Sequence, residues 1–166
     1  MSAAPGPTGY EICCDLERLD VSAIHAFLVG SYWARDIPRE LVERALRGSL
    51  CFGLFHGGEQ VGLARVVTDR ATFAYLCDVY VLEAHRGRGL ASWLVSQVLA
   101  HPQLQGVRRF LLATRDAHGL YAKLGFAPRD PARDDADAAS GENGRRAGHE
   151  EEEARPHRLP EDNDRH

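Results

Sequence analysis

Apolar and polar positions follow two periodicities along residues 1–129, one typical of strands and one typical of helices. Runs rich in β-branched and aromatic side chains predict strands over residues 10–16, 51–56, 60–68, 72–82, 109–113 and 126–129. Apolar residues at helical spacing predict helices over residues 23–30, 38–48, 89–100 and 118–123. The order β α α β β β α β α β indicates an α/β (α+β) domain whose mixed sheet carries helices on both faces.

Capping residues support the boundaries of the first two helices. Asp20 can cap the start of the first helix, and Gly30 can end it. Pro38 can open the second helix, which should stop at Gly48. Between the next two strands, residues 57–59 read Gly-Gly-Glu, which predicts a tight hairpin turn.

Residues 78–91, which read DVYVLEAHRGRGLA, pass from a strand through a glycine turn into a helix. Gly87 and Gly89 make the turn sharp, and the helix begins directly after it. Such a turn directs unpaired backbone N–H groups and the positive end of a helix dipole at one spot. An anion, above all a phosphate, is expected to bind there.

The glycine spacing distinguishes between known phosphate loops. The turn lacks the Lys and Ser or Thr of a P-loop and the three spaced glycines of a dinucleotide fingerprint. Residues 86–91, in the form Arg-x-x-Gly-x-Ala, instead resemble the turn of the GNAT superfamily of acyl-CoA-dependent N-acyltransferases. Residues 120–126, LYAKLGF, resemble a second signature of the same family. The alternative for the first motif alone is an ordinary strand-to-helix turn with solvated arginines.

The resemblance implies a GNAT fold, with a mixed, mostly antiparallel sheet that splays between its fourth and fifth strands. Acetyl-CoA would then be the co-substrate, with its pantetheine in the gap and its pyrophosphate on the turn. The main chain of the fourth strand would pair with the pantetheine, and Arg86 and Arg88 would add charged contacts. Thr114 stands where the family usually has Asn, and its hydroxyl can make one of the amide's hydrogen bonds. The implied cofactor-binding residues are Val79, Tyr80, Val81, Arg86, Gly87, Arg88, Gly89, Leu90, Ala91, Thr114 and Tyr121.

For catalysis, the resemblance implies that the hydroxyl of Tyr121 protonates the leaving thiolate. Asp78 is a candidate general base, on the opposite face of its strand from Val79 and Val81 by alternation. Two alternatives stay open for the base: Asp78 could pair with an arginine such as Arg70 or Arg115, or a water chain could deprotonate the amine. Arg65 interrupts the third strand and is expected to point out of the sheet.

The acceptor wall is expected between the first two helices, at Tyr32, Trp33 and Arg35. Aromatic rings there could hold a cation, although they could equally close the end of the core. We expect an N-acetyltransferase acting on a small-molecule amine. Two other hypotheses are acetylation of protein Lys or N-terminal amines, which the acidic tail supports, and a non-catalytic domain that binds acyl-CoA.

The composition of the chain limits its domain organisation and the class of protein it can be. The chain has 166 residues and a net charge of −4, and we divide it into a flexible N-terminus (1–9), one domain (10–129) and a disordered acidic tail (130–166). The tail holds twelve acidic and six basic residues and only one large apolar side chain, Leu159. The N-terminus has no export signal, no segment is a membrane span, and the four cysteines are expected to be buried reduced thiols with no metal site. We expect a cytoplasmic monomer or homodimer, with no nucleic-acid or membrane partner.

Overall fold

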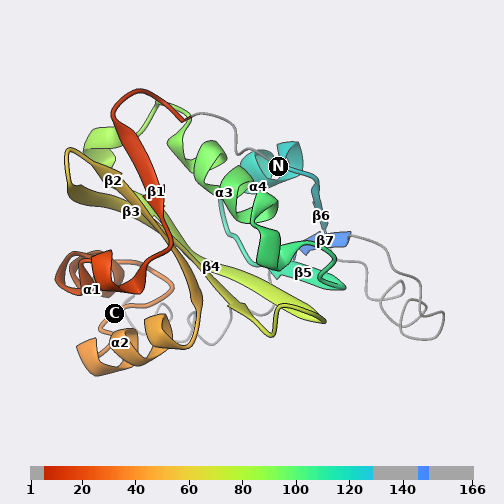
Figure 1. Ribbon diagram of the computed structural model, residues 1–166, viewed down its shortest axis with the longest axis horizontal. Coiled ribbons are helices and arrows are strands. Elements are labelled where there is room, and N and C mark those ends of the chain that lie inside the picture. The colour runs from red at the N-terminus through yellow and green to blue at the C-terminus, as the bar shows by residue number, and fades with distance from the viewer. Residues whose placement is uncertain (1–5, 129–145, 150–166) are drawn as a thin grey trace, which may run out of the picture.

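The computed structural model describes residues 6–128 and 146–149, which form a seven-stranded sheet with helices on both of its faces (Figure 1). The strand order is β1-β2-β3-β4-β5-β7-β6. The strands are β1 Tyr10–Cys13, β2 Leu50–His56, β3 Glu59–Thr68, β4 Phe73–Val81, β5 Arg109–Leu112, β6 Phe126–Pro128 and β7 Arg146–His149. The helices are α1 Val21–Val29, α2 Arg39–Arg47, α3 Leu90–Ala100 and α4 His118–Lys123, with 3-10 turns η1 Leu16–Arg18, η2 Glu83–His85 and η3 Pro102–Leu104.

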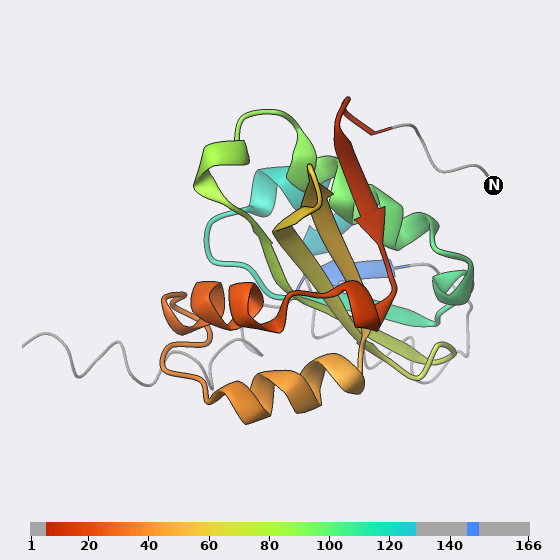
Figure 2. The same ribbon diagram turned by 60° about the vertical axis from the view of Figure 1, so that its left-hand side comes forward.

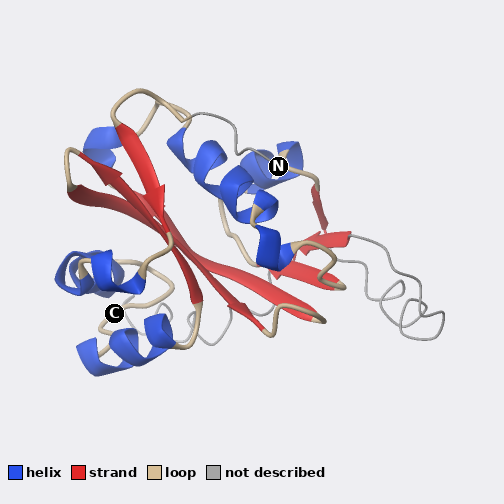
Figure 3. Cartoon of the chain, in the orientation of Figure 1, coloured by secondary structure: helices blue, strands red, loops and turns tan. Residues whose placement is uncertain are grey.

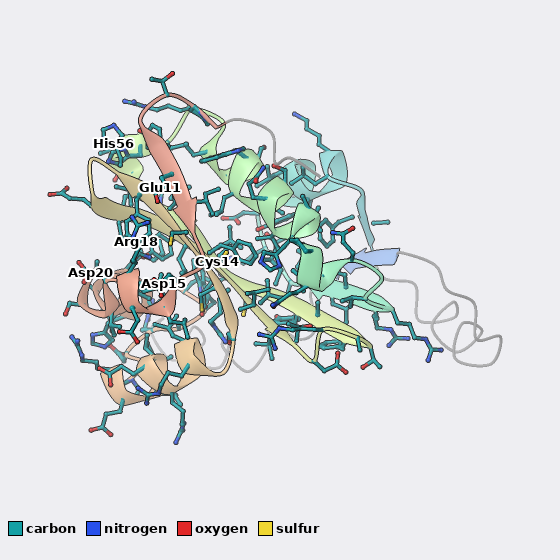
Figure 4. All side chains as sticks on the ribbon, in the orientation of Figure 1. Glu11, Cys14, Asp15, Arg18, Asp20 and His56 are labelled. Atoms are coloured by element: carbon teal, nitrogen blue, oxygen red, sulfur yellow. The ribbon has the colours of Figure 1, made fainter. Side chains whose placement is uncertain are left out.

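Local capping chemistry places the helix ends where the sequence predicts them. The Asp20 carboxylate, labelled in Figure 4, accepts a hydrogen bond from the backbone N–H of Ala23 at 3.0 Å and so starts α1. Gly30 ends that helix, while Pro38 precedes α2 and Gly48 ends it. These predictions are confirmed. They could be made from the sequence because each depends on residues that are close together in the chain.

The predicted splay of the sheet is also confirmed. Strands β1 to β4 are antiparallel neighbours, whereas β4 and β5 run parallel. Their pairing joins Phe73–Leu76 of β4 to Arg109–Leu112 of β5 and goes no further. The rest of β4, up to Val81, stays paired with β3 only. The second half of β4 therefore has no strand beside it on the edge where β5 pairs with the first half, and its backbone is open there (Figure 3).

Two layers of helices cover the sheet, α1 and α2 on one face and α3 on the other (Figures 1 and 2). Alternating residues of β2 and β3 supply the two cores. Cys51 and Leu63 pack with the α1–α2 layer, while Phe52 and Ala64 pack with α3. Both faces of the central strands are therefore buried, which explains why the β2 and β3 sequences are almost continuously apolar.

A β-bulge interrupts this alternation in β4. The register between β3 and β4 shifts between Leu63 and Arg65, so that Asp78 and Val79 together face Ala64. Asp78 has a left-handed φ of 52°, which is uncommon for a residue other than glycine. Because of the bulge, Leu76 packs on the α3 side, whereas Tyr80, four residues later, packs on the α1 side.

Strand β7 differs from the sequence prediction. It falls within residues 130–166, for which we predict disorder, and lies between β5 and β6, parallel to both. Its sequence, Arg-Ala-Gly-His, has no large apolar residue and therefore no recognisable strand pattern. The rest of that tail, like residues 1–5 of the predicted flexible N-terminus, lies outside the described residues.

Two smaller features complete the fold. The cysteines are all free thiols, and Cys51 is buried as predicted, but Cys14 is exposed because it follows the end of β1. At the outer edge of the sheet, the Arg18 guanidinium lies 4.9 Å from the centre of the Phe55 ring and forms an ion pair with Glu11 (Figure 4).

Within the described ranges, no helix has the length and apolar character that crossing a membrane requires.

Candidate functional site

A cavity of about 260 Å³ lies between the α1–α2 layer and the open half of β4, and it extends to α4. It brings together six of the residues singled out in the sequence, from four separate parts of the chain. They are Tyr32, Trp33, Asp78, Val79, Thr114 and Tyr121. The splay in the sheet makes this juxtaposition possible, because the β5–α4 segment can lie opposite the unpaired part of β4.

Tyr121 lies on α4 with only 7% of its surface exposed and packs edge-to-face on Phe126, with ring centres 5.9 Å apart. Burial raises the pKa of Tyr121 to about 12, and the neighbouring Tyr32 and Asp116 side chains add to this rise. The phenol is therefore protonated throughout the neutral range. Such a group can donate a proton inside the cavity.

Asp78 is the centre of a buried hydrogen-bond network. One carboxylate oxygen accepts from the indole N–H of Trp33 at 3.0 Å, and the other accepts from Nε of Arg65 at 2.6 Å. The side chains of Arg65 and Asp78 are only 17% and 11% exposed. A second nitrogen of Arg65 donates to the hydroxyl of Ser49 at 3.0 Å. This network joins the loop between α1 and α2, strand β3 and the β4 bulge.

The network corrects two predictions. The partner of Asp78 is Arg65, whereas Arg70 bonds to Gln103 at 2.8 Å and Arg115 lies 3.9 Å from the centre of the Tyr32 ring. Arg65 does not point out of the sheet into solvent, because strand alternation directs it to the face under α1 and α2, where the carboxylate of the bulge meets it.

The predicted phosphate turn has the backbone conformation that its glycines allow. Gly87 and Gly89 have left-handed φ values of 77° and 72°, and Gly89 is the residue preceding α3. In the described part of the chain, the N–H groups of Gly87, Arg88, Gly89 and Leu90 have no hydrogen-bond partner. No atom lies within 4 Å of where a Cβ would stand at either glycine. The turn is thus open, rich in free donors and suited to a pyrophosphate.

The arginines of this turn hold its shape in ways that the sequence did not indicate. Nε of Arg86 donates to the backbone carbonyl of Val81 at 2.8 Å, which ties the turn to the end of β4. Arg88 donates to the Tyr10 hydroxyl at 3.3 Å, and that hydroxyl also lies 2.8 Å from Nδ1 of His85. Tyr10 and His85 lie outside the motif, and a tyrosine in the first strand gives no local signal of contact with a turn 78 residues later.

Other predicted residues take different positions. Arg35 is exposed and does not line the cavity, although Ala34 before it and Ile37 after it both do. The Tyr80 side chain stacks on Phe27 with ring centres 3.8 Å apart and packs in the core beside α1, and Tyr80 does not line the cavity. The buried Thr114 hydroxyl accepts from the N–H of Ala117 at 3.0 Å, just before α4.

Sequence reasoning also missed several cavity residues. Tyr75 and Cys77 line it from β4, Val67 lines it from β3, and Asp116 lines it beside Tyr121. Their strand or loop positions are visible in the sequence, but only the register of the sheet shows which of them face this cavity. The sequence offered one signal of this site. Arg65 stands alone within an apolar strand, and a buried cation requires a buried partner.

Comparison with known proteins agrees with this geometry. The family model described as "Acetyltransferase (GNAT) family" matches residues 17–126. A solved structure from Xanthomonas campestris pv. campestris, assigned as an acetyltransferase of the GNAT family, is 52% identical, with a TM-score of 0.74 over 78% of this chain and 92% of that one. A Gibberella zeae protein named as an acetyltransferase is 38% identical over 137 residues, covering 69% of this chain and 76% of its own.

A third relative is more distant and covers less of the chain. N-alpha-acetyltransferase MAK3 of Arabidopsis thaliana is 34% identical over 84 residues, which is 46% of this chain and 44% of the relative. The family match spans the α1–α2 layer, the splayed strands, the glycine turn and α4. The chain therefore belongs to the acetyltransferase (GNAT) family.

Proposed function

We propose that this acetyltransferase moves the acetyl group of acetyl-CoA to the primary amine of a small molecule by direct attack. The observation that carries the proposal is the single cavity shared by Tyr121, the open edge of β4 and the aromatic pair Tyr32 and Trp33. Acetyl-CoA supplies an activated acyl group with a thiol leaving group. The amine nitrogen forms a bond to the carbonyl carbon as the carbon–sulfur bond breaks, and the amine loses a proton.

Binding of the co-substrate rests on two backbone features. The free N–H groups between Gly87 and Leu90, together with the start of α3, would hold the pyrophosphate. The main chain of Val79, beyond the point where β5 leaves β4, would donate to the thioester carbonyl. Arg86 occupies the carbonyl of Val81, so we assign Arg86 to holding the turn in place. The α3 dipole adds to the attraction for the diphosphate.

Tyr121 would give its proton to the departing sulfur. Its burial and raised pKa keep it protonated at the pH where a fraction of the amine is neutral. Bulk water can then return a proton to the phenolate after the product leaves. The network argues against Asp78 as the base, because both of its oxygens already accept hydrogen bonds from Trp33 and Arg65. We assign Asp78 to positioning and the deprotonation of the amine to water.

A second candidate is acetylation of a protein N-terminus. The Arabidopsis relative named as an N-alpha-acetyltransferase supports it, and an N-terminal amine has the same reactive chemistry as a small primary amine. The cavity of about 260 Å³ has room for a small acceptor, and a small-molecule amine remains our first candidate. A non-catalytic role would leave the buried phenol facing this cavity without a function.

The test measures binding and turnover separately. Calorimetry gives the affinity for acetyl-CoA, and thiol release is then followed with a panel of primary amines and N-terminal peptides for the native protein and for Tyr121→Phe. We expect the Phe variant to bind acetyl-CoA within about twofold of the native protein and to lose roughly 10²-fold or more in kcat. Binding without release of thiol on any acceptor would contradict the proposal, and preference for peptides would establish the second candidate.

A further inference from the structure

We propose that the acceptor is a primary amine with an apolar substituent, and that this substituent occupies the part of the cavity beneath α2. This inference rests on the proposed function. It concerns the apolar side chains that α1, α2, the loop between them and β3 contribute to the cavity lining, which we call the α2 arm. The arm is lined by Leu28, Ile37, Val42, Ala45, Leu46 and Val67.

The α2 arm is apolar because of how α2 meets the sheet. Val42 and Leu46 point from α2 into the core and are 1% and 4% exposed, and Leu28 of α1 is 2% exposed. Ala45 is the smallest side chain on that face of α2 and is only partly buried. Ala45 therefore takes up little of the cavity that it lines, and its aliphatic neighbours make the adjoining space suitable for a hydrocarbon. Val67, the arm residue from β3, is 41% exposed.

The charges around the cavity are distributed unevenly. Among its lining residues in the described part of the chain, the charged ones are Arg65, Asp78 and Asp116. Arg65 and Asp78 neutralise each other at 2.6 Å, so the ion pair presents no net charge to a ligand. Asp116 lies near enough to Tyr121 to raise its pKa. Asp116 would attract an amine that arrives as an ammonium, whereas the guanidinium of Arg115, 3.9 Å from the centre of the Tyr32 ring, would repel it. A second charge among the aliphatic side chains of the α2 arm would be buried without a partner.

Two aromatic residues also line the cavity. Tyr32 and Trp33 come from the loop that joins α1 to α2, with ring centres 5.0 Å apart, and both line the cavity. The guanidinium of Arg115 already lies over the Tyr32 ring, 3.9 Å from its centre, so the two rings offer their remaining surface to a hydrocarbon chain. The site is thus polar near the reacting atoms and apolar beyond them, which matches an alkyl or arylalkyl amine.

Two acceptors of equal size distinguish this inference from a general amine site. Hexylamine and cadaverine have the same number of non-hydrogen atoms, but a terminal methyl group in the first is an ammonium in the second. We expect kcat/KM for hexylamine to exceed that for cadaverine by about tenfold or more, because the α2 arm would desolvate the second charge. From ethylamine to hexylamine, kcat/KM should rise by about threefold to fourfold for each added methylene until the arm is full.

A pair of α2 variants tests the location. Ala45→Phe places a phenyl group in the arm and should lower kcat/KM for hexylamine by about tenfold or more while ethylamine changes by less than about twofold. Leu41→Phe is the matched control, since Leu41 is 40% exposed on the same helix, does not line the cavity, and should change neither substrate. Ala45→Leu gives a smaller version of the same effect if the Phe variant fails to fold.

The outcomes separate this inference from the proposed function. Turnover of many amines with no preference for hexylamine over cadaverine would overturn the apolar arm and leave the acetyltransferase proposal intact. Calorimetric titration of both amines into the protein saturated with CoA gives a readout that needs no turnover. Equal affinity for the two amines, or a loss of hexylamine binding in Leu41→Phe equal to that in Ala45→Phe, would also overturn it.

Discussion

The indole N–H of Trp33 donates a 3.0 Å hydrogen bond to the carboxylate of Asp78, a residue 45 positions further along the chain. This contact ties the loop between α1 and α2 to the bulge in β4. Asp78 keeps its left-handed backbone conformation there, with a φ of 52°, and Arg65 holds the other carboxylate oxygen. The proposed acceptor wall and the proposed thioester site therefore share one buried hydrogen-bond network.

Asp78→Asn tests whether this anchor positions the site or takes a proton. The amide can still accept from Trp33, but Arg65 loses its counter-charge, so we expect the free energy of unfolding to fall by about 2 kcal/mol in urea denaturation. If Asp78 only positions, the pH dependence of kcat/KM keeps its shape. A general base would instead show a loss of roughly 10²-fold or more together with a changed pH profile.

Asp116→Asn is the control for that experiment, because Asp116 is an exposed carboxylate beside the same cavity. It should leave the free energy of unfolding within about 0.5 kcal/mol of the native value. A loss of stability equal to that of Asp78→Asn would mean that the ion pair with Arg65 makes no particular contribution to the free energy of unfolding.

Trp33→Phe removes the hydrogen bond to Asp78 and keeps an aromatic ring. Loss of one hydrogen bond to a charged group costs about 1.5 kcal/mol of folding stability. We expect the KM for the amine to rise as well, because the loop that carries Tyr32 is no longer held to β4. Calorimetry should show an unchanged affinity for acetyl-CoA, because Trp33 lies far from the glycine turn in the sequence and makes no contact with it. Equal weakening of both ligands would show that the acceptor loop is not specific to the acceptor.

Gly89→Val should abolish measurable binding of acetyl-CoA. The φ of 72° is strained for a β-branched residue, and the added side chain would enter the open space in front of the turn. Gly106→Val is the matched control, since Gly106 has a φ of 75° and open space around it but lies in the loop before β5. Both variants should lose stability by about 1 to 2 kcal/mol, and only Gly89→Val should lose binding.

Stability should decrease at alkaline pH. Burial raises the pKa of the Cys51 thiol to about 12, so the neutral thiol stabilises the folded protein fully below its ordinary pKa and this contribution is lost as the pH rises toward 12. Under reducing conditions, Cys51→Ala should make the fall in unfolding free energy above pH 9 shallower by about 1 kcal/mol per pH unit. An unchanged slope would show that the Cys51 thiol is accessible to ionisation in the fold.

Local sequence patterns predicted most of the helices and strands. The contacts between residues far apart in the chain depended on how the strands pair. Asp20, Gly30 and Pro38 mark helix ends through contacts within one turn, so their roles were readable in the sequence. The pairing of Arg65 with Asp78 depends on the register of β3 against β4 and on a bulge, which no local pattern encodes. The sequence motifs likewise placed Tyr121 in the site, but not the apolar residues of the α2 arm.

The unpaired second half of β4 has a consequence for association between molecules. Exposed strand edges generally invite another chain to add itself, and proteins usually block them with charge, proline or short length. Here the free edge lies in the interior of the sheet, between neighbours on both sides, so a second folded molecule has little access to it. A slender extended ligand can reach these backbone groups, and the domain thereby keeps a reactive edge without the usual risk of aggregation.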